Sequence, residues 1–413
     1  MNKKILSWAL YDSANSVFFT TVMAGFFPVF FKQYWSGGAS AIDSTERLAW
    51  VLAVSGFLLA ILSPILGVIS DKRRSKKKFL TITMLAGAIG SAGLFFVPQG
   101  GWQAAAALYG FALFMCSASC VFYDSLMPSV VEPKQYDFVS SLGYSAGYLG
   151  GGIIFLINVL MYLKPQLFGI SSDVLAVRIS FLVVAIVWIL LSWPLLKWVP
   201  EPETHESTSG LWTLSQETFK ELKFTVMSIF KNKNLFYFVL AYWFYIDGVF
   251  TVMTMAVDFG LSLGLEASDL IKALLITQFV GFPSAYLFGV LATRWSNRNL
   301  ILLCLLIYMI VIIGASLMST GNHFFILATV IGLAQGGVQA LSRSLFAQLS
   351  PPEKSGEYFG FFNLLGKFAS VLGPILIALF ARVTGDSRQT ILSLLILVGA
   401  GGALLLRVQK PKL

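Results

Sequence analysis

Twelve long apolar runs constrain the fold of this 413-residue chain more than any other feature. A helix needs about 20 mostly apolar residues to cross a bilayer. Only 12% of the residues are charged, about half of the roughly 25% found in soluble proteins, so most of the apolar surface has to face lipid. We therefore predict an all-α integral membrane protein of about twelve transmembrane helices. The runs are residues 5–33, 48–69, 79–97, 102–127, 138–162, 174–198, 234–261, 267–292, 299–318, 322–348, 356–382 and 389–407.

Lysine and arginine gather on one side of the predicted membrane. They concentrate at both termini, in residues 72–78 and in the central segment 199–233. This side is cytoplasmic by the positive-inside rule. We therefore predict a multi-pass protein of the plasma (inner) membrane with both termini in the cytoplasm. The net charge of +9 is then a topology signal, and we expect no nucleic-acid partner.

The polar central segment divides the apolar runs into two sets of six. We predict an N-terminal half at residues 1–198, a linker at 199–233 and a C-terminal half at 234–413. Within the linker, apolar residues between 211 and 230 recur near helical spacing. This spacing predicts a short amphipathic helix on the membrane surface, and a docking site for a partner is the alternative.

An internal repeat relates the two halves. The pattern Trp8-x-x-x-Asp12 recurs in residues 243–247, and Asp124-Ser-Leu corresponds to Arg343-Ser-Leu. The matches follow the same order in both halves. Because six helices preserve orientation, the sequence predicts two halves related by a pseudo-two-fold axis along the membrane normal. That is the major facilitator arrangement, which holds its solute site near the midplane between the halves.

The motif that follows the second run resembles the major facilitator signature between helices two and three. It begins at Gly67 and continues through Asp71, Arg73 and the following basic residues. Gly67 would admit a helix of the other half, and Asp71 would bond a helix N-terminus or pair with an arginine across the halves. We expect this latch to favour the state closed to the cytoplasm. The sequence departs from the signature at Arg74, where glycine is usual.

Charged residues inside the apolar runs are the candidate functional groups, since each costs about 2.5–3.5 kcal/mol on insertion scales. A solute with both charges, such as an amino acid, would suit them: Lys367 or Arg343 would hold a carboxylate, and Asp247 or Asp12 an ammonium. An embedded aspartate is also a candidate proton carrier. Eight polar residues are our candidates for the solute or proton site: Asp12, Asn15, Asp247, Gln335, Gln339, Asn363, Lys367 and Tyr148.

Asp124 and Arg343 occupy equivalent positions near the cytoplasmic ends of the fourth and tenth helices. We predict a salt bridge between them that joins the halves and breaks when the transporter opens. Direct contact with the solute is the alternative. The residues assigned to the gate or latch are Gly67, Asp71, Arg73, Asp124 and Arg343.

Several longer segments resemble one subfamily of the major facilitator superfamily. They are SWALYDSANS at residues 7–16, GYSAGYLGGG at 143–152, QGGVQALSRS at 335–344 and FNLLGKF at 362–368. The subfamily includes the fungal autophagy-related vacuolar amino-acid effluxer. The resemblance spans nearly the whole chain. It implies a secondary transporter working by alternating access and points to amino-acid export.

Other functions remain open at this point. Tyr123-x-x-Leu126-x-Pro128 also resembles cation-coupled sugar symporters, although a buried Lys367 favours an anionic or zwitterionic solute. An enzyme is not expected, since there are two histidines and no paired glutamates. We expect no cofactor and no metal. The expected partners are a small solute, the lipid bilayer and a proton or another coupling ion, with the protein a monomer.

Overall fold

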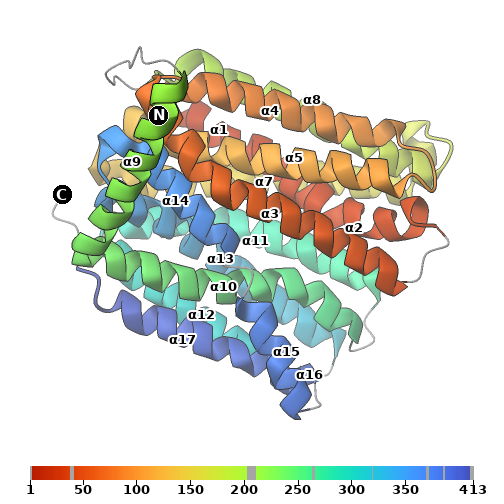
Figure 1. Cartoon of the computed structure of the whole chain (residues 1–413). Coiled ribbons are helices and arrows are strands. Elements are labelled where there is room, and N and C mark those ends of the chain that lie inside the picture. Colours follow the sequence, from red (N-terminus) through yellow and green to blue (C-terminus); the bar gives the residue numbers. More distant parts are fainter. Residues whose placement is uncertain are drawn as a thin grey trace.

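The computed structural model describes residues 2–37, 41–201, 211–262, 266–318, 320–368, 372–384 and 387–409. Figure 1 shows long helices running side by side in one bundle, with both chain ends at the same end of it. We call this the termini end and the opposite one the outer end. Ten helices in the described part are long and apolar enough to cross a membrane. This confirms the predicted all-α membrane fold.

The first six predicted runs all lie in helices. The first run is one continuous span, Lys3–Trp35. Its α-helical parts α1 (Lys3–Val17) and α2 (Phe27–Phe30) alternate with π-helical turns at Phe18–Phe26 and Phe31–Trp35. The other long helices of this part are α3 (Ala41–Lys72), α4 (Lys76–Gly93), α5 (Trp102–Ser125), α7 (Tyr136–Leu163) and α8 (Asp173–Trp198). The short α6 (Met127–Val130) follows α5.

A helix also occupies most of the predicted linker, and further helices follow it. They are α9 (Leu211–Lys231), α10 (Lys233–Ser262), α11 (Ala267–Ala292), α12 (Asn297–Ser316), α13 (Gly321–Leu349), α14 (Ser355–Phe368), α15 (Leu372–Thr384), α16 (Ser387–Thr390) and α17 (Leu394–Leu405). The division of the chain at residues 198 and 233 stays a prediction.

The eleventh run, residues 356–382, is helical wherever it is described. The structure describes it as two helices, α14 and α15, with residues 369–371 outside the described part. The backbone N–H groups of Leu372 and Gly373 donate to the carboxylate of Asp247, at 2.9 and 2.8 Å. A side chain on α10 therefore binds the first two N–H groups of α15.

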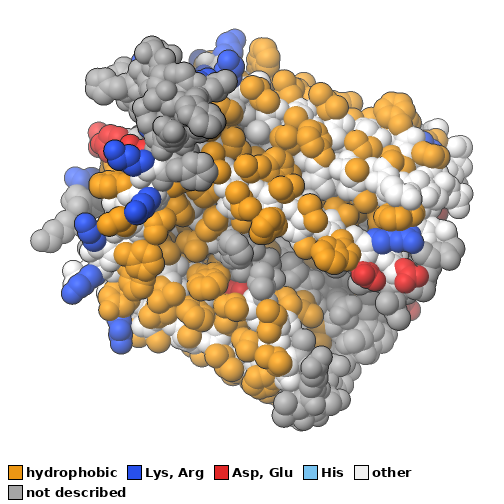
Figure 2. All heavy atoms as spheres, viewed as in Figure 1, with side chains coloured by type: hydrophobic (Ala, Val, Ile, Leu, Met, Phe, Trp, Pro, Cys, Tyr) orange, Lys and Arg blue, Asp and Glu red, His pale blue; other side chains and the backbone are white. Residues whose placement is uncertain are grey.

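The surface suits a bilayer. Figure 2 shows hydrophobic side chains over the middle of the bundle and most of the lysine and arginine of this face at the termini end. Phe57, Ile61, Ile186 and Leu190 are each about half exposed or more. Exposed apolar patches of this extent are rare on soluble monomers, so lipid is the environment that fits them.

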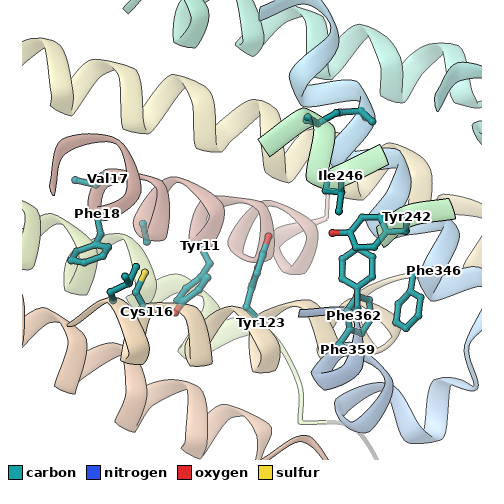
Figure 3. Close-up of a cluster of buried hydrophobic side chains, with 14 of the residues drawn as sticks. Tyr11, Val17, Phe18, Cys116, Tyr123, Tyr242, Ile246, Phe346, Phe359 and Phe362 are labelled. Atoms are coloured by element: carbon teal, nitrogen blue, oxygen red, sulfur yellow. The ribbon is translucent and has the colours of Figure 1, made fainter. Parts of the chain in front are cut away.

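Aromatic side chains pack the inside of each half. Figure 3 shows Tyr11, Phe18 and Tyr123 in one group, and Tyr242, Phe346 and Phe362 in another. In the second group the Phe362 ring stacks on Tyr242 and on Phe346, with centroids 4.3 and 4.8 Å apart. Such pairs contribute about 0.5–1.5 kcal/mol each beyond the area that they bury. They join α10, α13 and α14 into a firm unit.

Glycines of α7 let α1 approach closely. A Cβ at Gly147 would come within 2.7 Å of the Ser16 hydroxyl, and one at Gly150 within 2.5 Å of the Ser13 Cβ. The freed space brings the Ser13 hydroxyl to the Ala146 carbonyl, to which it donates at 2.7 Å. These glycines therefore serve helix packing.

The turn between α3 and α4 uses an unusual residue. Arg74 has φ of 49°, in the left-handed region that favours glycine. The N–H of Ser75 bonds the carbonyl of Ser70 at 3.2 Å, the pattern of a Schellman cap. The position where the family signature has glycine is thus the position that needs the left-handed conformation.

Replacing Arg74 tests this strain. Arg74→Gly should be more stable to unfolding than Arg74→Ala by about 1 kcal/mol, because only alanine keeps the left-handed penalty. Both variants lose the arginine side chain, so their difference isolates the backbone. The measurement is the unfolding midpoint of each variant in the same detergent, and equal midpoints would contradict the assignment.

Candidate functional site

A buried arginine joins the two sets of helices at the termini end. Arg343 comes from α13 and is 2% exposed. Its Nη2 lies 2.9 Å from Oδ2 of Asp12 on α1, and its Nη1 lies 3.1 Å from Oδ1 of Asp124 on α5. The expected pairing of Asp124 with Arg343 is therefore present in the structure. Asp12 completes a three-charge cluster, which we call the Arg343 triad.

Arg343 makes two further hydrogen bonds, both to Ser140 on α7. Its Nε donates to the Ser140 hydroxyl and its Nη2 to the Ser140 carbonyl, both at 2.8 Å. The Ser140 hydroxyl in turn donates to the carbonyl of Ala340 at 2.7 Å. A buried ion survives only when such hydrogen bonds replace its hydration. Ser140 on α7 is thus a partner that charge and depth in the sequence did not reveal.

Three aromatic rings surround the guanidinium. Its Cζ lies 4.9 Å from the ring centre of Trp8, 5.5 Å from that of Tyr123 and 4.3 Å from that of Tyr144. The Tyr123 hydroxyl donates to Asp12 at 2.8 Å. Cation–π contacts of desolvated arginine are worth about 2 kcal/mol. Aromatic rings of the N-terminal helices therefore surround the Arg343 side chain, which comes from the C-terminal helices.

The triad changes the expected grouping of the charges. The sequence predicts Asp12 in the solute site and Asp124 in the gate. In the structure both carboxylates share Arg343. The reason is geometric: α1 and α5 pack side by side, as the stacking of Trp8 on Tyr123 at 4.5 Å shows, so their aspartates face the same point.

The motif after α3 forms a second contact between the halves. Oxygens of Asp71 accept the backbone N–H groups of Gly356 and Glu357 at 3.1 and 2.8 Å. These groups begin α14, so the carboxylate meets the positive end of a helix dipole. This is the first of the two alternatives that we expected for Asp71.

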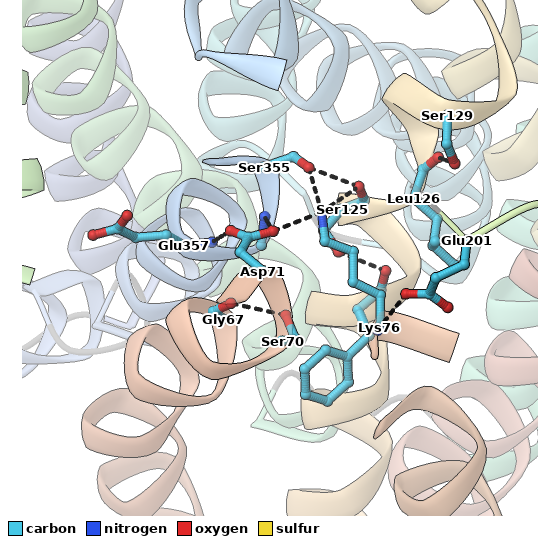
Figure 4. Close-up of polar contacts among 12 residues, drawn as sticks. Gly67, Ser70, Asp71, Lys76, Ser125, Leu126, Ser129, Glu201, Ser355 and Glu357 are labelled. Carbon is cyan, nitrogen blue, oxygen red and sulfur yellow. Dashed lines mark hydrogen bonds and ion pairs between the residues drawn. The ribbon is translucent and has the colours of Figure 1, made fainter. Parts of the chain in front are cut away.

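Lys76 supplies the cation of this latch, and it is not among the residues that the sequence assigned to the latch. Its Nζ lies 2.7 Å from Oδ1 of Asp71 and 2.7 Å from the Ser355 hydroxyl. Figure 4 shows Lys76 reaching toward Asp71, Ser355 and Ser125 at the junction. Arg73, which the sequence also assigned to the latch, is half-buried. Lys76 is the first residue of α4. The turn between α3 and α4 reverses the chain, so the Lys76 side chain lies beside Asp71 at the end of α3.

Close backbone contact makes the latch possible. A Cβ at Gly67 would overlap the carbonyl of Gly356, and one at Gly360 would reach 2.6 Å from the carbonyl of Ser63. The Ser63 hydroxyl donates to the Gly360 carbonyl at 3.0 Å. Small residues on α3 and α14 therefore let the two backbones touch. We call this contact the front seam.

A second seam lies between α7 and the pair α11 and α13. The Ser145 hydroxyl donates to the Phe282 carbonyl at 2.9 Å. At the termini end Asp137 accepts a hydrogen bond from Ser344, and its carboxylate also accepts from Gln348 and Asn297, each at 3.2 Å. Asp137 is a further junction residue that the sequence analysis missed, because it lies at the edge of a predicted run.

Two of the predicted solute residues, Asn15 and Gln339, lie about one turn outward of the triad. Asn15 follows Asp12 by three residues, and Gln339 precedes Arg343 by four, which places them about 5–6 Å nearer the outer end. Asn15 Nδ2 contacts the sulfur of Cys120, and Gln339 Nε2 that of Met253, both at 3.7 Å. Both amides thus donate to sulfur atoms, which are weak acceptors.

Four other predicted residues differ in what they contact. The Tyr148 ring packs against Gly281 and Gly336 in the second seam. Asn363 is half-buried and donates to its own helix at Phe359. Gln335 is buried. The side chain of Lys367 lies outside the described part of the chain.

Asp247 is fully buried, and its best-defined contacts are structural. It caps α15 and also accepts a hydrogen bond from Thr251 at 3.3 Å. The depth of Asp247 was foreseen from the sequence, and its use as a helix cap was not. Among the described residues, no group of three or more His, Cys, Asp or Glu is placed to hold a metal.

A helix substitution tests the front seam. Gly67→Ala should disfavour the closed arrangement by about 1–3 kcal/mol, because the added methyl overpacks against Gly356. The reporter is the rate at which a thiol reagent labels Ser63→Cys, with the three native cysteines replaced by serine. Gly56→Ala on the same helix meets open space and should leave the rate unchanged. A similar rate in both variants would contradict the role of Gly67.

A double-mutant cycle tests the triad. Arg343→Gln leaves two buried carboxylates without their cation and should cost about 3–5 kcal/mol. Adding Asp124→Asn removes one of those charges, so the double variant should recover part of the loss, with a coupling of about 0.5–3 kcal/mol. Unfolding midpoints in detergent measure all four corners of the cycle. Strict additivity of the two single changes would show that the pair does not interact.

Comparison with known proteins identifies relatives along the whole chain. The family described as "Vacuole effluxer Atg22 like" matches residues 1–412. The MFS-type transporter YxiO of Bacillus subtilis is 39% identical over 402 residues, which cover 96% of this chain and 92% of that protein. Autophagy-related protein 22 of Eremothecium gossypii is 23% identical over 97% of this chain and 89% of its own length. In Autophagy-related protein 22 of Yarrowia lipolytica the match is 25% identical and spans 48% of that protein.

Solved structures share the fold. The transporter FucP in its outward conformation matches with a TM-score of 0.72 over 99% of this chain and all of that chain, at 13% identity. The proton:xylose symporter XylE matches with a TM-score of 0.71 over 99% of this chain and 95% of that chain, also at 13% identity. Both belong to the major facilitator superfamily, and the likeness concerns the fold alone.

Proposed function

Because this chain belongs to the Atg22-like vacuole effluxer family of the major facilitator superfamily, we propose that it exports a small zwitterionic solute, an amino acid first of all, from the cytoplasm. Family membership makes the chain a multi-pass membrane transporter of the MFS type, a class distinct from enzymes. The solute, the direction and the coupling are our proposal. The plasma membrane, with both termini in the cytoplasm, is the location that we propose with it.

The Arg343 triad is the observation that carries the proposal. Charges of both signs meet where the two sets of helices touch, and solute sites of this fold lie between the halves. In the proposed cycle the triad and the front seam close the termini end, which is the cytoplasmic side. Solute would bind about one turn nearer the outer end, beside Asn15 and Gln339. Lys367 would hold its carboxylate.

The triad also suggests how a proton could be coupled. Two carboxylates face one guanidinium, so uptake of one proton would leave a balanced ion pair and one neutral acid. A neutral acid no longer needs Arg343 as its partner, which lowers the cost of separating the halves. We propose the proton as the coupling ion, with Asp12 or Asp124 as its acceptor.

A ligand screen tests the solute class. Purified protein in detergent is heated with amino acids, dipeptides, organic acids and sugars at two pH values. A ligand that binds only the folded state stabilises it by about 2.7 kcal/mol at a hundredfold excess over Kd. We expect neutral and apolar amino acids to raise the midpoint. A response to sugars alone would contradict the proposal and favour a sugar symporter.

A substitution of Lys367 tests whether this residue binds the carboxylate of the solute. Lys367→Gln should abolish stabilisation by the amino acid that binds wild type, since it removes the proposed partner of the carboxylate, while the unliganded protein stays folded. Lys272→Gln is the matched control, because Lys272 is exposed and pairs locally with Asp269. Unchanged binding in Lys367→Gln would refute this site. Asp247→Asn is the less selective test, because Asp247 also caps α15.

A further inference from the structure

Helix α9 connects both sides of the front seam. Figure 1 shows it crossing the termini end of the bundle near α3 and α14. Leu222 enters a groove between Pro64 of α3 and Phe361 of α14. The preceding residue of α9, Glu221, pairs with Lys354, just before α14, at 2.7 Å. The helix therefore touches α3 by packing and the start of α14 by an ion pair as well.

The two faces of α9 differ sharply in exposure. Thr225 and Ile229 face inward and are 1% and 8% exposed. Phe224, Met227 and Phe230 face outward and are 61%, 47% and 65% exposed. Their spacing of three residues places them in one stripe along the helix. A stripe of two phenylalanines and a methionine facing water would be costly, so an apolar environment is expected to cover it.

Cations bracket this stripe. Lys220 and Lys223 lie at one end of it and Lys231 at the other, and all three are exposed. Lys354 already has a partner, because it donates a hydrogen bond to Glu221. This bond lowers the pKa of the Glu221 carboxyl below its ordinary value. An apolar stripe flanked by lysines is the pattern that binds an anionic lipid surface.

The height of α9 along the bundle agrees with a membrane surface. Trp198 at the end of α8 and Trp295 after α11 are 42% and 59% exposed at the same end of the bundle. Exposed tryptophans mark the interface between acyl chains and headgroups. The lysines of α9 therefore lie at the level where lipid phosphates are found.

The groove below Leu222 supplies an apolar path into the seam. It measures about 270 Å³, and every side chain that lines it is apolar, including Ile61, Pro64 and Leu364. Ile61 is 49% exposed on α3, and Phe57, four residues before it on the same helix, is 62% exposed. Because this surface of a transmembrane helix faces acyl chains, the groove is open to a lipid tail from the side.

We propose that α9 and the front seam form a binding site for an anionic phospholipid. Its phosphate lies against Lys220 and Lys223, and one acyl chain enters the groove between α3 and α14. The bound lipid contacts both sets of helices, so it stabilises the arrangement closed at the termini end. This site is separate from the solute site, and its test does not depend on transport.

The experiment compares full-length protein in nanodiscs of phosphatidylcholine with and without phosphatidylglycerol. Lipid that stays bound after extraction into detergent is quantified by mass spectrometry, and the unfolding midpoint is measured in each disc. Phosphatidylglycerol should be enriched over phosphatidylcholine and should raise the midpoint. The double variant Lys220→Gln/Lys223→Gln should lose about fivefold of this enrichment per lysine, with an unchanged midpoint in phosphatidylcholine alone.

The control neutralises two cations at the same end of the bundle but beside the second seam. Lys134 precedes α7, Arg294 follows α11, and both are exposed. The variant Lys134→Gln/Arg294→Gln should keep the enrichment of wild type. Wild-type enrichment in the Lys220/Lys223 variant would overturn the proposal. So would equal retention of phosphatidylethanolamine, because the site would then not recognise an anionic headgroup.

A measurement on wild type covers the case in which the double variant fails to fold. Raising the salt concentration screens exposed charges over a Debye length of about 8–10 Å. The enrichment of phosphatidylglycerol should therefore fall as salt is added before extraction. Enrichment that is insensitive to salt would show that the lysines do not hold the lipid and would overturn the proposal.

Discussion

The burial of one guanidinium organises this protein. Arg343 lies in a low-dielectric interior, where an unpaired charge is strongly destabilising and a paired one still needs hydrogen bonds in place of its hydration. Its partners are all on the N-terminal helices: two carboxylates, the Ser140 hydroxyl and carbonyl, and three aromatic rings. Arg343 itself is on α13, so the two sets of helices must meet at the termini end for the charge to be compensated.

The other contacts at this end share a chemistry that suits separation. Asp71 meets a helix N-terminus, Lys76 bridges to Ser355, and glycines bring α3 onto α14. Polar contacts of this kind exchange for water at a small net cost. Most aromatic pairs, by contrast, lie within one set of helices, as with Tyr242 and Phe362, and the pair of Phe138 with Tyr286 crosses between the sets. Strong apolar packing thus keeps each unit rigid, while reversible contacts join the units, as alternating access would require.

Several features of the site followed from the sequence because they rest on local rules. Apolar length predicted the spans, and the equivalence of Asp124 and Arg343 in the repeat predicted their pairing. The motif at Gly67 and Asp71 predicted a contact with a helix of the other half. The position of Arg74 in the motif matched the one left-handed turn between α3 and α4. Each of these depends on spacing along one helix or on a comparison within the chain.

Other features depend on which helix packs beside which. Asp12 joins Asp124 on Arg343 because α1 and α5 are neighbours, and Lys76 reaches Asp71 because the turn between α3 and α4 folds back onto the latch. Asp247 caps α15 across a gap of 125 residues to Leu372. α9 likewise reaches both sides of one seam only in the folded bundle.

The sequence by itself thus determined the membrane fold, the repeat and which charges must be buried, because hydropathy and helical periodicity act along the chain. The tertiary structure alone decided how those charges are shared. A buried ion takes whichever partners the packing brings within about 3 Å, and that choice arises between helices that are distant in sequence.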